Sequence, residues 1–261
     1  MKLFLPLTLL FTCLWAAAQE PVLVHGHAHN DYAHKRPLFD ALENSFGSVE
    51  ADIFWYGGQI KVAHIPLGLS SKKTLDELYL HPLDSIIKLN GGTVYKGQTT
   101  PLILMIDFKD AGAVLYPALQ EAIKPYHNWL TLYQGDSIVR PGAVQLLISG
   151  NRPKLNDDTC YVTLDEDLGN LAKTDSHKHA TRYSSGWGRY FSWNGKGEMP
   201  AAQQQLLDTL VKQVHALNKQ IRFYHIPDKE NAWKVLLNAG VDWINTDKLK
   251  LFRRYYRSRS N

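Results

Sequence analysis

The chain has 261 residues, of which 44% are hydrophobic, and its 29 Lys and Arg exceed its 25 Asp and Glu to give a formal net charge of +4. So mild a charge excludes a strongly basic nucleic-acid-binding protein, and no segment resembles a nucleic-acid-binding module. The length is sufficient for one large domain with a well-buried core.

The first predicted element is an export signal over residues 1–18. Lys2 gives it a positive start, the apolar run LFLPLTLLFTCLW is too short to span a bilayer, and AAA supplies a small-residue cleavage site. We therefore expect an exported protein, periplasmic or secreted, with no integral membrane span after the signal is removed. A lipoprotein anchored through Cys13 is the alternative, and without Cys13 the remaining Cys160 has no partner for an intramolecular disulfide.

Short apolar runs alternate with helical patterns over residues 19–261, where we predict a single domain. Strands are expected at residues 21–26, 48–54, 101–108, 143–149, 160–166, 189–193, 221–226 and 241–245. Helices are expected at residues 36–46, 73–90, 113–126, 200–219, 229–240 and 248–257. Eight strands in a strand-then-helix order predict an α/β fold, a (β/α)8 TIM barrel.

Two carboxylates share one face of the second predicted strand, SVEADIF. Side chains alternate along a strand, so Glu50 and Asp52 face one way while Val49, Ala51 and Ile53 face the other. The apolar face should pack on helices, which leaves both acids pointing into the barrel mouth. Neighbouring carboxylates repel unless a cation lies between them, and a divalent cation is the usual solution. Surface acids on an edge strand are the alternative, but a closed barrel has no edges.

The third predicted strand, PLILMIDF, ends in another polar pair. Ile103, Met105, Asp107 and Lys109 alternate onto one face, so the polar side chains come only at the strand's end. Asp107 is a candidate third carboxylate for the same cation, and Lys109 is a candidate contact for an anionic substrate. A structural ion pair between the two is the alternative, and the sequence leaves both interpretations open.

Histidines occur at matching positions. The HGHAHND motif closes the first predicted strand, and IKVAHIP ends an extended run after the second, so His29 and His64 are both expected at the barrel mouth. Two imidazoles beside an oxygen-ligated cation suit acid–base chemistry at a bound phosphate. His25 and His27 are candidates for orienting the site or binding its ligand.

Taken together, these residues resemble the phosphatidylinositol-phospholipase-C-like phosphodiesterase superfamily, in particular an exported subgroup of glycerophosphodiester-phosphodiesterase-like TIM barrels. The resemblance is carried by the segments HND, SVEADIFW, VAH and LILMIDFK in the first half and by FYHIPDKENAWKVLLNAGVDWINTD in the second. The chain lacks the His-Arg-Gly start of glycerophosphodiester phosphodiesterases and the Glu-Asn-Thr that follows it, which puts glycerophosphodiester substrates specifically in question.

The resemblance implies a metal-dependent phosphoric diester hydrolase whose substrate is a glycerophosphodiester, a lysophospholipid or a similar small or lipid-derived phosphodiester. It implies one Mg²⁺ or Ca²⁺, held by the hard oxygen ligands of Asn30, Glu50, Asp52 and Asp107.

The resemblance also implies roles for the remaining residues. His29 and His64 would serve as base and acid, in either order, and Lys109 would neutralise charge on the phosphoryl oxygens. Tyr224 and Asp247 fall near an aromatic and a polar position of the superfamily, and with His27 they are the candidate substrate contacts.

Two alternatives come from other functional classes. In an amidohydrolase-like hydrolase, an HxH pair from His25, His27 and His29 would bind a transition metal with His225 and Asp247. That assignment leaves the carboxylates and Lys109 without a role. In a non-catalytic ligand-binding barrel, exposed aromatic rings would stack on a ligand. The candidate rings are those of Trp55, Tyr56, Trp187, Trp193 and Trp243.

Overall fold

The computed structural model describes residues 21–173 and 178–259. The predicted export signal, with Cys13, lies outside the described residues. No helix within the described ranges is long and apolar enough to cross a bilayer.

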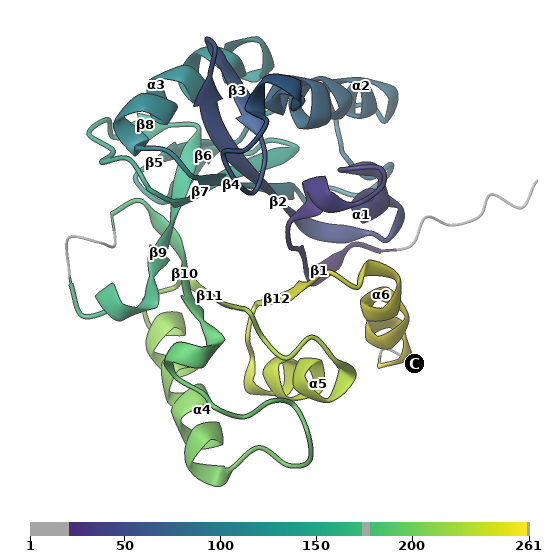
Figure 1. Cartoon of the computed structure of the whole chain (residues 1–261), viewed down its shortest axis with the longest axis vertical. Helices are drawn as coiled ribbons and strands as arrows, with labels where there is room; N and C mark the ends of the chain where they lie inside the picture. The colour runs from purple at the N-terminus through teal and green to yellow at the C-terminus, as the bar shows by residue number, and fades with distance from the viewer. Residues whose placement is uncertain (1–20, 174–177, 260–261) are drawn as a thin grey trace, which may run out of the picture.

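Eight parallel strands of the described chain close into a barrel, which confirms the predicted TIM-barrel fold. The strands run in the order β1-β12-β11-β10-β9-β7-β4-β2, and a β1–β2 pairing closes the ring. Figure 1 looks down this ring, with the helices on its outside. The barrel strands are β1 (Leu23–Ala28), β2 (Phe46–Tyr56), β4 (Leu102–Phe108), β7 (Val144–Gly150), β9 (Val162–Asp167), β10 (Ala180–Gly186), β11 (Gln220–Tyr224) and β12 (Trp243–Thr246).

Six α-helices of the described chain follow barrel strands and cover the outside of the ring. They are α1 (Phe39–Glu43), α2 (His81–Leu89), α3 (Gly112–Ile123), α4 (Ala201–His215), α5 (Glu230–Ala239) and α6 (Leu249–Ser258). A π-helical turn at Asp76–Leu80 leads into α2. The helix predicted over residues 36–46 is shorter than expected, because β2 already begins at Phe46.

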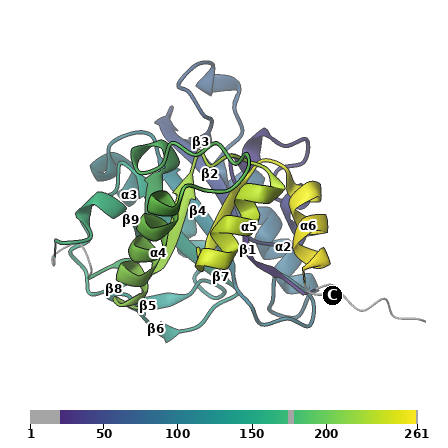
Figure 2. The ribbon, with the colours of Figure 1, turned by 90° about the horizontal axis from the view of Figure 1, so that it is seen from below.

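The connections on either side of β9 contain no α-helix in their described residues. The connection before β9 contains the short strand β8 (Thr159–Cys160), which forms a small antiparallel sheet with β5 (Leu132–Gln134) and β6 (Ser137–Arg140) from the segment between α3 and β7. Figure 2 shows this sheet at the end of the barrel opposite to β3 (Gln59–Val62), which pairs antiparallel with β2 as a hairpin.

The sixth strand was predicted at the wrong place. It was expected at residues 189–193, but β10 is the segment ATRYSSG at Ala180–Gly186. Its inward side chains are polar, so it lacks the apolar run that a buried strand usually shows. The aromatic side chains of the expected segment, Phe191 and Trp193, are buried against the barrel from a loop instead.

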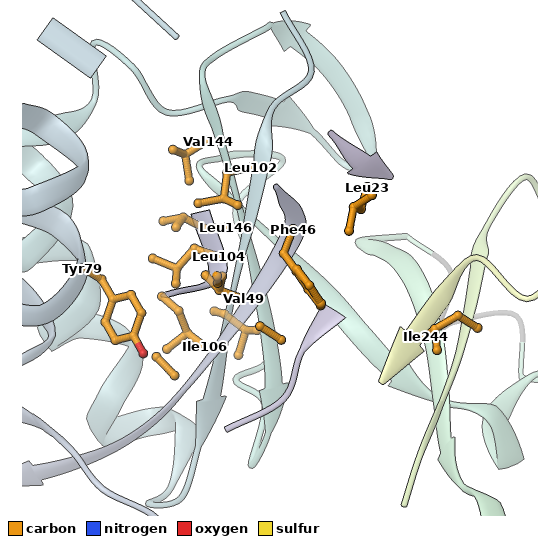
Figure 3. Close-up of a cluster of buried hydrophobic side chains, with 14 of the residues drawn as sticks. Leu23, Phe46, Val49, Tyr79, Leu102, Leu104, Ile106, Val144, Leu146 and Ile244 are labelled. Carbon is orange, nitrogen blue, oxygen red and sulfur yellow. The ribbon is translucent and has the colours of Figure 1, made fainter. Parts of the chain in front are cut away.

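Buried apolar side chains of the described residues form a large cluster outside the barrel, a small one inside it, and a third where β2 meets the segment after β3. The outward faces of β2, β4 and β7 join the large core between barrel and helices, where Val49, Leu104 and Leu146 are fully buried (Figure 3). Inside the barrel, Met105 and Trp243 belong to a small cluster of four apolar residues. The predicted alternation along β2 and β4 is therefore confirmed, and it turns the polar side chains of both strands inward.

Candidate active site

One cavity of about 520 Å³ opens at the carboxyl ends of the barrel strands. Seven of the sequence-predicted residues line it, namely His29, Asn30, Glu50, His64, Asp107, Lys109 and Tyr224. Three others contact these from outside the lining, namely His27, Asp52 and Asp247. The fold thus brings ten residues from five barrel strands and the loops that follow them to one place.

The Lys109 ammonium lies between two carboxylates at the centre of the site. Its Nζ is 2.9 Å from Asp52 Oδ2 and 2.5 Å from Asp107 Oδ2. Cross-strand register explains this contact, since Asp52 and Asp107 are direct partners in the β2–β4 pairing. Partial burial lowers the pKa of Lys109, but the two carboxylates outweigh it and the net shift is upward, so the ammonium is retained. Ser149 donates to the other oxygen of Asp107 at 2.6 Å.

His64 is held by a carboxylate and a phenol. Its Nδ1 lies 3.0 Å from Asp52 Oδ2 and 3.1 Å from the hydroxyl of Tyr32. The same hydroxyl is 2.7 Å from both Asp52 Oδ2 and Asn30 Oδ1. Sequence reasoning missed Tyr32, because a tyrosine in a short 3-10 turn four residues past the end of β1 carries no periodic signal. These contacts leave Nε2 of His64 for the cavity.

The side chain of His29 is held by Asp247, which directly follows β12, the neighbour of β1 on the side away from β2. Its Nδ1 lies 2.8 Å from Asp247 Oδ1, and the ring is 18% exposed. Partial burial lowers the pKa of His29, but the hydrogen bond to Asp247 and the charges of Glu50 and Asp247 outweigh it and raise the pKa above the usual value. The hydrogen bond from His29 in turn lowers the pKa of Asp247.

Glu50 and His27 both contact the buried guanidinium of Arg222 beneath the cavity. Nε2 of the fully buried His27 lies 3.0 Å from Glu50 Oε2 and 2.8 Å from Arg222 Nη1. Because a guanidinium only donates, Nε2 accepts from Arg222, and Nδ1–H donates to the Ser48 hydroxyl at 2.7 Å. Burial, followed by the charge of Arg222, lowers the pKa of His27 well below its usual value, so the ring is neutral.

Polar side chains from β9 and β10 continue this buried layer. Asp165 Oδ2 accepts from Ser184 at 2.8 Å, whereas Asp165 Oδ1 is buried without a hydrogen-bond partner in the described chain. Fully buried Arg182 lies 4.8 Å from the Trp243 ring, and burial lowers its pKa to about 9. Sequence reasoning missed these residues; polar side chains at alternate positions of the true sixth strand were the available signal.

The oxygen donors at the centre fit a hard divalent cation by their chemistry. Asp52 Oδ1 is buried with no hydrogen-bond donor within the described residues, as an oxygen awaiting a cation would be. As the side chains stand, the Lys109 ammonium occupies the point where Asp52 and Asp107 converge. Accordingly, no group of three or more His, Cys, Asp or Glu side chains in the described ranges is arranged to ligate an ion. A divalent cation held by Asn30, Glu50, Asp52 and Asp107 therefore requires Lys109 to withdraw from at least one carboxylate.

The geometry weighs against both alternatives. An HxH metal site would use Nε2 of His27, which faces the Arg222 cation. His25 is bonded to the Asp242 carbonyl oxygen at 2.8 Å. Of the five aromatic residues considered for ligand stacking, Trp187, Trp193 and Trp243 are buried, and only Trp55 and Tyr56 are exposed.

Comparison with known proteins places the chain in a family. Residues 17–158 match the family model of the AIM6-like phosphodiesterase domain, and residues 220–250 match that of the glycerophosphoryl diester phosphodiesterase family. Altered inheritance of mitochondria protein 6 of Saccharomyces cerevisiae is 32% identical over 268 residues, which cover 85% of this chain and 68% of that protein. Its namesake in Eremothecium gossypii is 28% identical over 274 residues, which cover 90% and 70% respectively.

A solved structure shares the fold. A glycerophosphodiester phosphodiesterase from Parabacteroides distasonis superposes with a TM-score of 0.55 at 14% identity, covering 93% of this chain and 99% of that one. The chain therefore belongs to the AIM6-like phosphodiesterase family, within the phospholipase-C-like phosphodiesterase superfamily of TIM barrels.

Proposed function

We propose that the protein is a metal-dependent phosphoric diester hydrolase. The observation that carries this proposal is the shared cavity of His29 and His64, each bonded through Nδ1 to a carboxylate, beside the Asp52–Lys109–Asp107 centre. Two imidazoles with their Nε2 atoms available can move protons to and from a phosphodiester, which is the chemistry that its hydrolysis needs.

In this proposal a divalent cation, Mg²⁺ or Ca²⁺, is held by Asn30, Glu50, Asp52 and Asp107 and supplies Lewis-acid polarisation of a phosphoryl oxygen. Lys109, with its raised pKa, carries a full positive charge that offsets negative charge on the equatorial oxygens. His29 and His64 take the roles of base and acid, and their order is left open.

The cavity lining supports a polar substrate. Apart from Tyr224 and Gly150, every described lining residue has a polar or charged side chain, and none is aliphatic. An acyl chain would meet no aliphatic side chain among the described lining residues, so its burial there would bring little hydrophobic stabilisation. We therefore expect glycerophosphodiesters to be turned over faster than lysophospholipids, and Tyr224 to be the aromatic contact for the substrate. His27 and Asp247 act on the ligand through Glu50 and His29.

Hydrolysis of bis(4-nitrophenyl) phosphate, with and without added Mg²⁺ or Ca²⁺, tests the reaction class. A panel of glycerophosphodiesters, lysophospholipids and inositol phosphodiesters, analysed for products, then tests the substrate class. Metal-dependent release of 4-nitrophenol and of a phosphomonoester is the expected result. No turnover of any substrate with metal present would contradict the proposal and favour a binding barrel.

The location and partners belong to the same proposal. We propose export on the strength of the sequence of residues 1–18, and a small or lipid-derived phosphodiester as the ligand.

A further inference from the structure

His225 has an unusual backbone conformation at the rim of the cavity. It is the first residue after β11, and its φ of 55° lies in the left-handed region that few residues other than glycine adopt. Its side chain is exposed and lines the cavity beside Tyr224. A strained backbone conformation at an exposed residue that lines a cavity indicates a functional constraint.

Folding does not account for this conformation as it does for Leu38. That residue, with a φ of 65°, is fully buried, and its N–H donates to buried Asp31 at 2.6 Å. Among the described residues, the ring of His225 contacts two other rings, that of His29 at 6.3 Å and 90° and that of Tyr224 at 5.2 Å and 82°. Neither of its ring nitrogens has a hydrogen-bond partner in the described part of the chain, so both are available to a ligand.

The cations of the cavity are already paired with acids. Lys109 bridges Asp52 and Asp107, and Arg152 Nη2 lies 2.8 Å from Glu166 Oε1. The third, Arg222, is buried and lies within 3.5 Å of both Glu50 and Asp165. A phosphoryl anion therefore needs N–H donors that no carboxylate already holds.

We propose that His225 is a phosphoryl-binding residue, a third imidazole that donates an N–H to a phosphoryl oxygen from the β11 side of the cavity. This inference rests on the proposed function, since it assumes a phosphate-bearing ligand beside His29. The left-handed turn after β11 serves to direct the ring toward that ligand. The contact is made both in the substrate complex and in the transition state. Its loss therefore weakens binding more than it lowers turnover.

The chain offers a matched control at the other end of the same strand. Asn218, two residues before β11, has the same φ of 55° and is exposed, but it does not line the cavity. Glycine adopts positive φ without strain, so His225→Gly and Asn218→Gly make the same backbone substitution. Only the first removes an imidazole from the site.

Two measurements on the full-length protein test the proposal: calorimetric binding of inorganic phosphate with Mg²⁺ present, and KM and kcat for bis(4-nitrophenyl) phosphate. In His225→Gly we expect phosphate affinity to fall and KM to rise about tenfold, the loss of one hydrogen bond to a charged group, with kcat within about threefold. Asn218→Gly should match the wild type, and neither variant should have a lowered Tm.

The outcomes separate this inference from the proposed function. Wild-type phosphate affinity and KM in His225→Gly would overturn the role of His225 and leave hydrolysis intact. A wild-type protein that binds phosphate without hydrolysing any diester, and loses that binding in His225→Gly, would overturn hydrolysis and support His225. A wild-type protein that neither binds phosphate nor hydrolyses any diester would overturn both.

Discussion

The carboxylate of Asp247, just past the last barrel strand, lies 2.8 Å from Nδ1 of His29, just past the first. Parallel pairing of Ala28 with Thr246 brings these ends together, so closure of the barrel creates the pair. The carboxylate stabilises the imidazolium and contributes to the raised pKa of His29, whose ring therefore stays protonated to a higher pH than a free imidazole.

Removing this carboxylate should lower the pKa of His29. In Asp247→Asn the imidazolium loses its hydrogen-bonded counter-charge, so we expect the limb of the pH–rate profile that reports His29 to move to lower pH. The measurement is kcat/KM against pH for a chromogenic diester. Asp242→Asn is the control, because Asp242 makes a similar pair with His215 at 2.9 Å outside the cavity. An unmoved limb in Asp247→Asn would show that His29 does not govern it.

Alanine at His29 or at His64 should each lower kcat. We expect a loss of about two to four orders of magnitude in either variant, the usual contribution of a proton-transfer group. His215→Ala, which removes an exposed imidazole outside the cavity, should leave kcat unchanged. Near-normal turnover in both cavity variants would rule out the two-histidine mechanism.

Lys109→Met should separate metal binding from turnover. Without the ammonium, Asp52 and Asp107 repel each other, so we expect Mg²⁺ to bind about tenfold more tightly by calorimetry. Turnover should nevertheless fall by about two to three orders of magnitude, because the positive charge at the phosphoryl oxygens is gone.

The control for Lys109→Met is Lys88→Met. It breaks a lysine–aspartate pair with Asp84 on α2, and neither residue lines the cavity. Unchanged Mg²⁺ affinity in Lys109→Met would mean that the ammonium and the ion do not compete.

Arg222→Met should destabilise the fold. It leaves buried Glu50 and Asp165 without the cation within 3.5 Å of both, and we expect the free energy of unfolding in urea to fall by about 3–5 kcal/mol. Arg36→Met removes an exposed guanidinium from its pairs with Asp40 and Glu43 and should lower the free energy of unfolding far less, because water screens exposed ion pairs. Similar losses in the two variants would contradict a structural role for the buried network.

Local periodicity was enough to predict much of the fold and half of the site. Alternation along SVEADIF and LILMIDFK placed Glu50, Asp52, Asp107 and Lys109 on inward faces, and the structure confirms those faces. Periodicity does not identify β10, because inward polar residues such as Arg182 replace the apolar run that is typical of a buried strand. The same polar residues give β10 its part in the buried polar layer.

Neighbours a few positions apart in the sequence specify the strand-then-helix order, the faces of the first strands and the residue types that meet at the barrel mouth. Which of those residues become partners depends on the folded chain. The pairing of His29 with Asp247, the placement of Tyr32 against His64 and the burial of Arg222 beneath His27 all depend on ring closure and strand register. These join residues from different strands and loops, and no local pattern encodes such distances.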